Sequence, residues 1–211
     1  MGQGKFIVFE GIDGSGTTTQ ARAAANWLRS QDVDVVETHE PTDGPVGELL
    51  RKALSRQMPG CEGEMLEPHF FALLFATDRM HHMRTLVVPA IEAGQYVVSD
   101  RCYLSSFAYQ SVDYDLDLVR AMNGEVRRAD LTFLLDLDVE EADRRLTPRT
   151  LFDDAPREVF ETPEMMARVR ANYLDIADLL EAEGERIVRI DAGQSREAVA
   201  AEVRQTLAEL L

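Results

Sequence analysis

Short segments rich in β-branched and aromatic residues alternate with longer segments of helical spacing along the whole chain. The short segments are residues 5–10, 33–39, 95–100, 130–138 and 186–192. Alternation of this kind predicts a mostly parallel sheet that is covered by helices on both faces. We therefore expect an α/β fold of three layers, α/β/α, around a five-stranded sheet. The 211 residues suit one domain, 1–211, because no repeat or low-complexity linker divides them.

The spacing of apolar residues also predicts the helices between these strands. The expected helices cover residues 17–30, 45–56, 68–94, 116–127, 139–146, 163–184 and 196–210. Open parallel sheets bind their ligands beyond the carboxyl ends of the strands. Polar residues gather at those ends, among them Glu10, Glu40, Asp100, Asp136 and Asp191. We therefore expect the functional site at this edge of the sheet.

The composition argues against several classes of partner. A formal net charge of −16 repels DNA, RNA and anionic lipid at long range. No run approaches the ~18 apolar residues of a membrane helix, and the N-terminus lacks the apolar core of a signal peptide. Cys61 and Cys102 form no C-x-x-C pair, so we expect two free thiols. We therefore expect a cytoplasmic protein that binds neither nucleic acid nor a membrane.

A glycine-rich segment, GIDGSGTTT at residues 11–19, lies between the first expected strand and the first expected helix. Gly11, Gly14 and Gly16 let backbone N–H groups turn toward phosphate oxygens, and the helix N-terminus adds partial positive charge. The full phosphate-loop motif ends in Lys followed by Ser or Thr. Here Thr17 stands at the lysine position, and Thr18 has the hydroxyl that binds a metal ion. The alternative is a glycine turn with a threonine cap.

A second motif, Asp100–Arg101, ends the third expected strand. An Asp at this position can hold Mg²⁺, and an adjacent Arg can bind a phosphate through two parallel hydrogen bonds. The alternative is a structural ion pair at a strand end. Without the loop lysine, a diphosphate or triphosphate can still bind to the amides, but its transfer needs positive charge from elsewhere.

Five segments together resemble the thymidylate kinase family, and their order and spacing cover nearly the whole chain. They are FEGIDGSGTTTQ (9–20), HEPTDGPVGELLR (39–51), LLFATDR (73–79), DRCYLSSFAYQ (100–110) and RIVRIDAGQSREAV (186–199). The resemblance implies a P-loop nucleotide kinase that transfers the γ-phosphate of ATP to dTMP, giving dTDP for dTTP synthesis. It also implies a homodimer, for which the apolar helix at 66–91 could supply the interface.

The resemblance assigns the ATP site, with Mg²⁺, to the phosphate loop and to the end of the last strand. The residues implied are Gly11, Ile12, Asp13, Gly14, Ser15, Gly16, Thr17, Thr18, Thr19, Ala192 and Gly193. Thr18 and Asp100 would be the metal ligands. Asp13 and Asp100 would lie near the transferring group and count as catalytic.

The resemblance assigns the dTMP site to Pro41, Arg51, Phe75, Arg79, Arg101, Ser105, Tyr109 and Gln110. Phe75 would stack on thymine, although the apolar run FFALLF by itself favours a core residue. Arg79 would hydrogen-bond the edge of the base. Arg101, together with Arg51, would hold the phosphate, and Tyr109 would disfavour a ribose hydroxyl.

Residues 147–161 interrupt the expected helix with prolines and lie where nucleotide kinases carry a lid over ATP. Arg149 and Arg157 are the arginines that would replace the missing lysine, with Arg145 at the helix end behind them. The alternative is a solvated loop whose arginines pair with Asp153 and Asp154. A second departure from the family is Cys102, which stands where the family has an aromatic residue or His.

The sequence therefore favours a dTMP kinase. Two other functions remain open at this point: a kinase of another nucleoside or nucleoside monophosphate, and a nucleotide-binding protein that has lost its chemistry together with the lysine.

Overall fold

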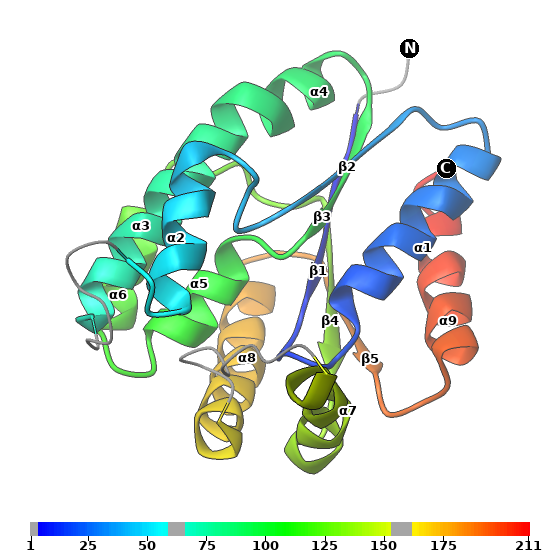
Figure 1. Cartoon of the computed structure of the whole chain (residues 1–211). Coiled ribbons are helices and arrows are strands. Elements are labelled where there is room, and N and C mark those ends of the chain that lie inside the picture. Colours follow the sequence, from blue (N-terminus) through cyan, green and yellow to red (C-terminus); the bar gives the residue numbers. More distant parts are fainter. Residues whose placement is uncertain (1–3, 59–65, 153–161) are drawn as a thin grey trace.

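The computed structural model describes residues 4–58, 66–152 and 162–211, and shows a five-stranded parallel sheet (Figure 1). The strands are β1 (Phe6–Glu10), β2 (Val35–His39), β3 (Tyr96–Asp100), β4 (Leu131–Asp136) and β5 (Ile187–Asp191). Their order across the sheet is β2-β3-β1-β4-β5, and every neighbouring pair is parallel. The predicted strands and the predicted α/β/α fold are confirmed.

Helices cover both faces of the sheet (Figure 1). One face carries α1 (Thr17–Ser30) and α9 (Arg196–Ala208). The other carries α3 (Pro68–His82), α4 (Val88–Glu92), α5 (Tyr103–Gln110) and α8 (Pro163–Ala182), with α2 (Pro45–Leu54) and α6 (Leu116–Met122) outside them. The remaining helix, α7 (Val139–Phe152), projects beyond the carboxyl edge of the sheet. No helix in the described ranges is long and apolar enough to cross a membrane.

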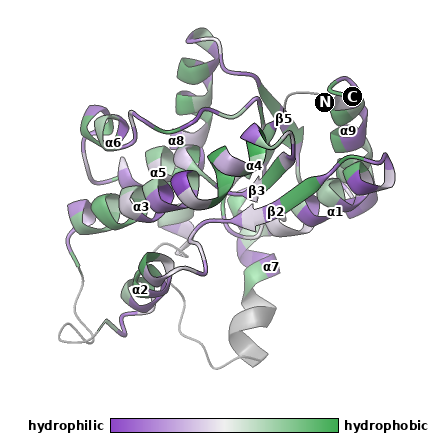
Figure 2. Ribbon diagram, turned by 90° about the horizontal axis from the view of Figure 1, so that it is seen from above, coloured by the Kyte–Doolittle hydropathy of each residue, from purple (hydrophilic) through white to green (hydrophobic). Residues whose placement is uncertain are grey.

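The central strands are buried on both faces, which explains their continuous apolar runs. All five residues of β1 are buried, and Phe9 stacks on Phe133 of β4 with ring centroids 4.9 Å apart. The edge strand β2 is only half-buried. Figure 2 shows the apolar residues concentrated on the strands and the hydrophilic ones on the outward faces of the helices.

Some helical segments differ from the prediction; the helix expected at 116–127, for example, ends at Met122. The expected helix 68–94 contains a π-helical stretch, η1 (Met83–Val87), just before Pro89, which has no backbone N–H to donate. The backbone of residues 147–152 continues α7, so the predicted interruption of the helix at 147 was wrong, while the lid itself stays a prediction. Pro148 removes one backbone hydrogen bond, but the helix continues through it. Residues 153–161, the rest of that segment, lie outside the described residues.

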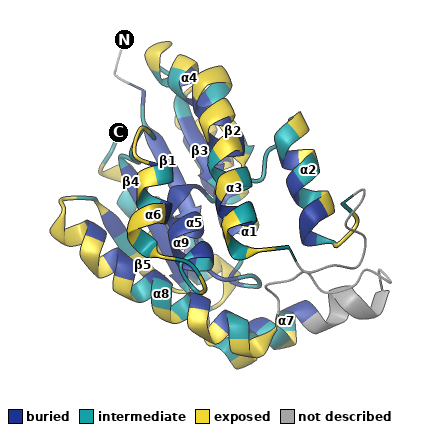
Figure 3. Cartoon of the chain, turned by 90° about the vertical axis from the view of Figure 1, so that its left-hand side faces the viewer, coloured by how far each residue is buried: buried dark blue, intermediate teal, exposed yellow. Residues whose placement is uncertain are grey.

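The helix α5 was not predicted from spacing, although its sequence was part of the second motif. All of its residues except Tyr109 are buried, as Figure 3 shows. A helix that is buried on every side has no polar face and therefore no amphipathic period. The polar residues of α5 thus lie inside the protein, directly behind the site.

Candidate active site

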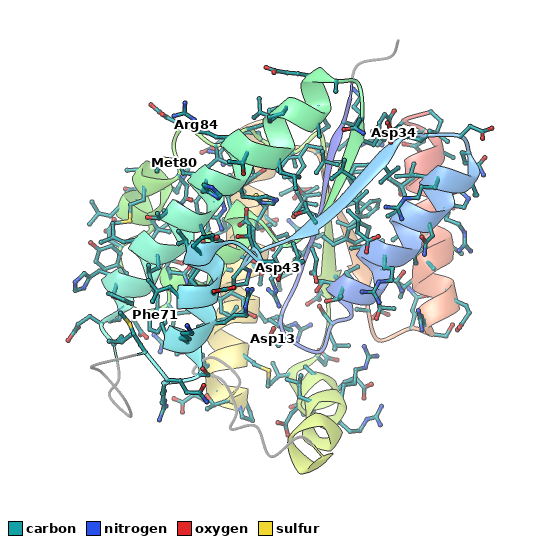
Figure 4. The ribbon with its side chains drawn as sticks, turned by 45° about the horizontal axis from the view of Figure 1, so that its top comes forward. Asp13, Asp34, Asp43, Phe71, Met80 and Arg84 are labelled. Atoms are coloured by element: carbon teal, nitrogen blue, oxygen red, sulfur yellow. The ribbon has the colours of Figure 1, made fainter. Side chains whose placement is uncertain are left out.

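The candidate site lies at the carboxyl edge of the sheet, as expected from the strand ends. The register places Asp100 beside Phe9 of β1 and His39 of β2, and Asp136 beside Asp191 of β5. The loops after these strands therefore meet at one end of the molecule, and Asp13 lies among them in Figure 4.

The phosphate loop needs its glycines. Gly11, Gly14 and Gly16 have positive φ angles of 155°, 85° and 92°. A Cβ on Gly11 would lie 2.6 Å from the carbonyl oxygen of Leu135, whereas a Cβ on Gly16 would meet nothing within 4 Å. Gly16 caps α1 and faces open space, which is the geometry of an anion site at a helix N-terminus. The side chain of Thr17 is buried in the same loop.

The two expected metal ligands lie side by side. The hydroxyl of Thr18 donates a hydrogen bond to Oδ2 of Asp100. The other carboxylate oxygen, Oδ1, is buried and has no hydrogen-bond partner within the described part of the chain. Two oxygen ligands with spare lone pairs are what Mg²⁺ binds through its inner or outer shell. No group of three or more His, Cys, Asp or Glu among the described residues could hold a metal ion, so phosphate or water oxygens would have to complete this site.

A cavity of about 290 Å³ adjoins the phosphate loop on the donor side. Its lining comprises Gly14, Ser15, Gly16, Thr19, Gln20, Arg145, Ala192, Gln194, Arg196 and Val199. Ala192 was predicted to be near ATP, and it does line this cavity. Gly193 lies next to it and donates its N–H to Asp191 at 2.8 Å.

Arg145 of α7 lines this cavity, as does Arg196. Its Nη1 donates to the carbonyl of Gly14 at 3.3 Å, and its Nη2 donates to the carbonyl of Ala192 at 3.0 Å. Its Nε donates to Glu141 at 2.7 Å. Arg145 therefore joins the phosphate loop to the loop after β5. The side chain of Arg149 and all of Arg157 lie outside the described structure.

A second, smaller cavity of about 80 Å³ lies on the acceptor side. It is lined by Asp13, Pro41, Leu54, Phe75, Arg101, Ser105, Ser106, Tyr109 and Gln110. Most of the residues predicted for the acceptor therefore meet in one place. Phe75 is half-buried on the wall of the cavity, so it is more than a core residue. Ser106 Oγ and both polar atoms of the Gln110 side chain are buried and lack a partner within the described residues.

Arg101 forms the charged end of this cavity. Its Nη1 donates to Gly11 O, Ser105 Oγ and Tyr173 OH at 2.9, 3.2 and 3.2 Å. Its Nη2 donates to Asp13 Oδ1 at 2.7 Å. Burial alone would lower the pKa of Arg101, but Tyr109, Asp13 and other partners outweigh it and hold that pKa well above its usual value. The guanidinium is therefore a fixed cation at neutral pH.

Tyr109 closes the cavity beside Arg101. Its hydroxyl donates to Oδ2 of Asp13 at 3.1 Å, and its ring lies 5.4 Å from the guanidinium carbon of Arg101. Asp13 thus accepts from both Arg101 and Tyr109, and it connects the phosphate loop to the acceptor wall.

Arg79 does not line the cavity, which is where the resemblance placed it. Its side chain is 1% exposed. It donates to Glu40 at 2.9 Å, to Asn123 at 2.5 Å and to the carbonyl of Cys102 at 3.1 Å. Burial would raise the pKa of Glu40, but Arg79 and His82 outweigh burial and lower it. A contact between Arg79 and the base stays a prediction, while the structure shows a buried ion pair behind the site.

Arg51 lies at the mouth of the acceptor side without lining the cavity. It donates to the carbonyl of Pro41 at 3.1 Å and lies 3.6 Å from the exposed Asp43. Its part in binding the phosphate also stays a prediction.

Sequence reasoning missed several residues of the site: Leu54, Ser106, Arg145 as a bridge, and the buried pair of Glu10 and Tyr173. The signals for two of them were visible. Glu10 is a lone carboxylate at the end of an apolar strand, and Tyr173 is a polar ring on the apolar stripe of α8.

Comparison with known proteins decides the family. The family model described as thymidylate kinase matches residues 9–203. The chain belongs to the thymidylate kinase family. It is 41% identical over 179 residues to a probable thymidylate kinase of Thermococcus gammatolerans, covering 83% of this chain and 84% of the relative. It is 39% identical over 178 residues to a probable thymidylate kinase of Pyrococcus horikoshii, covering 84% of each chain.

A bacterial relative matches over more of the chain. The thymidylate kinase of Clavibacter sepedonicus is 40% identical over 207 residues, which cover 95% of this chain and 93% of the relative. The predicted membership of the thymidylate kinase family and the predicted class of enzyme, a nucleoside monophosphate kinase, are therefore confirmed.

Proposed function

We propose that this chain transfers the γ-phosphoryl group of ATP to dTMP, giving dTDP and ADP. The observation that carries this proposal is the acceptor cavity, where an aromatic wall, buried amide and hydroxyl groups, and a fixed guanidinium meet beside the phosphate loop. Phe75 offers a face for the base, and Arg101 offers charge for the phosphate. The membership of the thymidylate kinase family supports the same acceptor.

The base is recognised by polar groups that are otherwise unpaired. Ser106 Oγ and the Gln110 amide are buried without partners among the described residues, which costs about 1–3 kcal/mol for each unsatisfied group. A pyrimidine edge that donates and accepts hydrogen bonds would remove this cost. An acceptor without matching groups would leave the cost in place, so these two side chains give selectivity as well as affinity.

The phosphates are held at the end of the sheet. Arg101 holds the acceptor phosphate, and Asp13 and Tyr109 keep the guanidinium in place. The amides of residues 14–18 hold the donor phosphates at the N-terminus of α1. Thr18 and Asp100 would hold Mg²⁺, which would supply positive charge that offsets the charge of the phosphates.

The charge of the missing lysine is supplied by arginines. Arg145 already contacts the phosphate loop from α7, and the segment that carries Arg149 and Arg157 continues from the same helix. We assign Arg149 and Arg157 to the transferring phosphoryl group. An arginine in this role contributes on the order of 10³–10⁵ in rate, which is enough to replace a lysine.

The proposed function is tested by measuring ADP release, with saturating Mg·ATP, for dTMP, dUMP, dCMP, ribothymidine monophosphate and GMP. We expect turnover with dTMP at the highest kcat/KM and a clear loss with the ribonucleotide, because we assign Tyr109, which lines the cavity, to the sugar. Equal rates for dTMP and its ribonucleotide would contradict the role of Tyr109. Binding of ATP without turnover of any monophosphate would contradict the proposed reaction.

We also propose a homodimer that forms through α3. Leu73 and Met80 are 51% and 58% exposed and lie seven positions apart, so they share one face of the helix; Met80 points outward in Figure 4. Leu118 of α6 is 50% exposed as well. Sedimentation equilibrium should show a dimer that Met80→Glu weakens, while a wild-type monomer would contradict the proposal.

A further inference from the structure

A buried glutamate lies directly beneath the acceptor site. Glu10 ends β1 and is fully buried. Its Oε1 accepts the backbone N–H of Cys102 at 2.9 Å. Its Oε2 accepts the hydroxyl of Ser105 at 2.5 Å and that of Tyr173 at 3.2 Å. One carboxylate thus joins the third strand's loop, α5 and α8.

The same two hydroxyls hold the guanidinium of Arg101. Nη1 of Arg101 donates to Ser105 Oγ and to Tyr173 OH, each at 3.2 Å. The hydroxyls also contact each other at 2.8 Å. Each hydroxyl can accept from the arginine and donate to the carboxylate, so the chain Arg101–hydroxyl–Glu10 has a consistent direction.

The backbone of Arg101 is fixed by the same region. Its φ angle is +71°, a left-handed conformation that is uncommon for a residue with a side chain. Ser99 Oγ donates to the carbonyl of Arg101 at 2.7 Å, and the N–H of Arg101 donates to Phe9 O at 2.8 Å. The next N–H, that of Cys102, is the one that Glu10 accepts. Such strain persists only where the surroundings determine the conformation, and it is common at functional sites.

We propose that Glu10, acting through the hydroxyls of Ser105 and Tyr173, is a positioning residue that orients Arg101 toward the phosphate of the acceptor, and that the two hydroxyls share this role. The proposal rests on the function proposed above, in which Arg101 holds that phosphate. None of the three residues needs to touch the reacting atoms. The hydrogen bonds of the two hydroxyls occupy Nη1 of Arg101. The phosphate can therefore approach the guanidinium in one orientation.

The burial of Glu10 lowers the stability of the fold, and this supports the proposal. Burial raises the pKa of Glu10 to about 7, although Ser105, Arg101, the N–H of Cys102 and Arg79 each lower it. A carboxylate at this position therefore destabilises the fold at neutral pH, whereas a neutral apolar side chain would not. A residue that costs stability in this way is expected where it serves activity.

The test uses the full-length chain and the variants Tyr173→Phe, Ser105→Ala and Glu10→Gln. Initial rates are measured with dTMP varied at saturating ATP, and with ATP varied at saturating dTMP. We expect Tyr173→Phe and Glu10→Gln to raise the KM for dTMP about tenfold, the effect of one hydrogen bond to a charged group, and to leave the KM for ATP within about twofold.

Tyr103→Phe is the matched control. Tyr103 also donates its hydroxyl to a carboxylate, that of the partly buried Glu185, but neither residue lines the cavity. This variant loses a comparable hydrogen bond and should keep both KM values. Tyr173→Phe keeps the ring, and thermal unfolding of each variant separates a folding defect from a defect in binding.

The possible outcomes are distinct. A KM for dTMP that stays at the wild-type value in both Tyr173→Phe and Glu10→Gln would overturn the positioning role. Equal increases in both KM values would also overturn it, because they would indicate a general structural defect. Failure of the wild type to phosphorylate dTMP would instead contradict the proposed function itself.

Discussion

The two halves of the site are built in different ways. On the acceptor side, buried polar side chains from β1, α5 and α8 surround Arg101, and the cavity is small, at about 80 Å³. On the donor side, the cavity is larger, at about 290 Å³, and its one contact from α7 is made by a long arginine side chain that is 31% exposed. The cation of the acceptor half is thus fixed by buried groups, whereas the cation that α7 contributes to the donor half is partly exposed.

This difference indicates where each half obtains its positive charge. Arg101 is fixed before any ligand arrives, because Gly11, Asp13, Ser105 and Tyr173 all accept its hydrogen bonds. The donor half lacks the loop lysine, and in our proposal its positive charge comes from arginines of α7 and of the residues after it. Preorganised charge such as that of Arg101 lowers the barrier without reorganisation during the reaction.

The largest effect is expected from Arg101→Ala, which removes the charge of the acceptor half. We expect kcat/KM for dTMP to fall by about 10³-fold, because Asp13 is then left without its cation and the phosphate loses a bidentate partner. Arg101→Lys should recover little, since an ammonium group cannot make two parallel hydrogen bonds. The measurement is initial rates, with circular dichroism to confirm folding. A near-normal kcat/KM in Arg101→Ala would show that the acceptor phosphate binds elsewhere.

The next effect concerns the donor half. Arg149→Ala or Arg157→Ala should lower kcat by about 10²-fold and change the KM for ATP little, since charge supplied in the transition state affects kcat more than binding. Thr17→Lys should change kcat by less than about twofold, because arginines already supply the charge.

The opposite pattern defines the rival explanation, in which Thr17 is a lesion. There, Thr17→Lys would raise kcat at least about tenfold, or about 1.4 kcal/mol, and the variants of Arg149 and Arg157 would be silent. The same three variants under saturating substrates therefore decide between the two explanations.

The difference between the halves also explains what the sequence could predict. The strands and the phosphate loop follow from local patterns: apolar runs, glycines and a helix start. The sequence named Arg145 as a reserve cation but could not predict its contacts with Gly14 and Ala192, which lie 131 and 47 positions away in the chain. These contacts depend on the packing of α7 beside the phosphate loop; a Cβ on Gly14 would lie 3.0 Å from the carbonyl oxygen of Ala142.

The acceptor half was predictable only through the family pattern. Phe75 lies in an apolar run that indicates core, and Ser105 and Gln110 are polar residue types that would be expected at the surface, although both are buried. The hydrogen-bond network beneath Arg101 joins residues that are far apart in the chain: Glu10 and Tyr173 are separated by 163 positions. Such a pairing depends on the three-dimensional fold and not on any local spacing.

A smaller effect is expected on the free energy of unfolding. It tests whether the buried Glu10 of the acceptor half destabilises the folded state. The folded state holds the proton of Glu10 more tightly than the unfolded chain, with a pKa of about 7 against 4.5. Raising the pH from 4.5 to 7 therefore lowers the free energy of unfolding. This loss of stability is complete above pH 7. Its upper limit is about 3 kcal/mol.

Glu10→Gln removes this titration. We expect the variant to be more stable than the wild type at pH 8, by about 1–3 kcal/mol, and the difference to shrink toward pH 5. Urea unfolding at both pH values measures it, and the difference between the two proteins cancels the other carboxylates. A stability difference that does not change with pH would show that Glu10 does not titrate in this range.

The smallest effect concerns the bridge made by Arg145, which is the counterpart of Arg101 on the donor side. Arg145→Ala removes the hydrogen bonds to the carbonyls of Gly14 and Ala192 and leaves the loops after β1 and β5 unconnected. We expect the KM for ATP to rise about three- to tenfold, which corresponds to about 1 kcal/mol, while the KM for dTMP stays unchanged.

The neighbouring Arg144→Ala is the control for that variant. Arg144 donates to the same Glu141 at 2.7 Å, but its side chain is 73% exposed. Exposed pairs of this kind contribute about 0–1 kcal/mol, so this variant should keep both KM values. Equal increases in the KM for ATP in Arg145→Ala and Arg144→Ala would mean that both arginines act through Glu141 or through the net charge of α7. A change confined to Arg145→Ala would show that a single surface arginine joins the two loops of the donor half, while the acceptor half relies on its buried carboxylate.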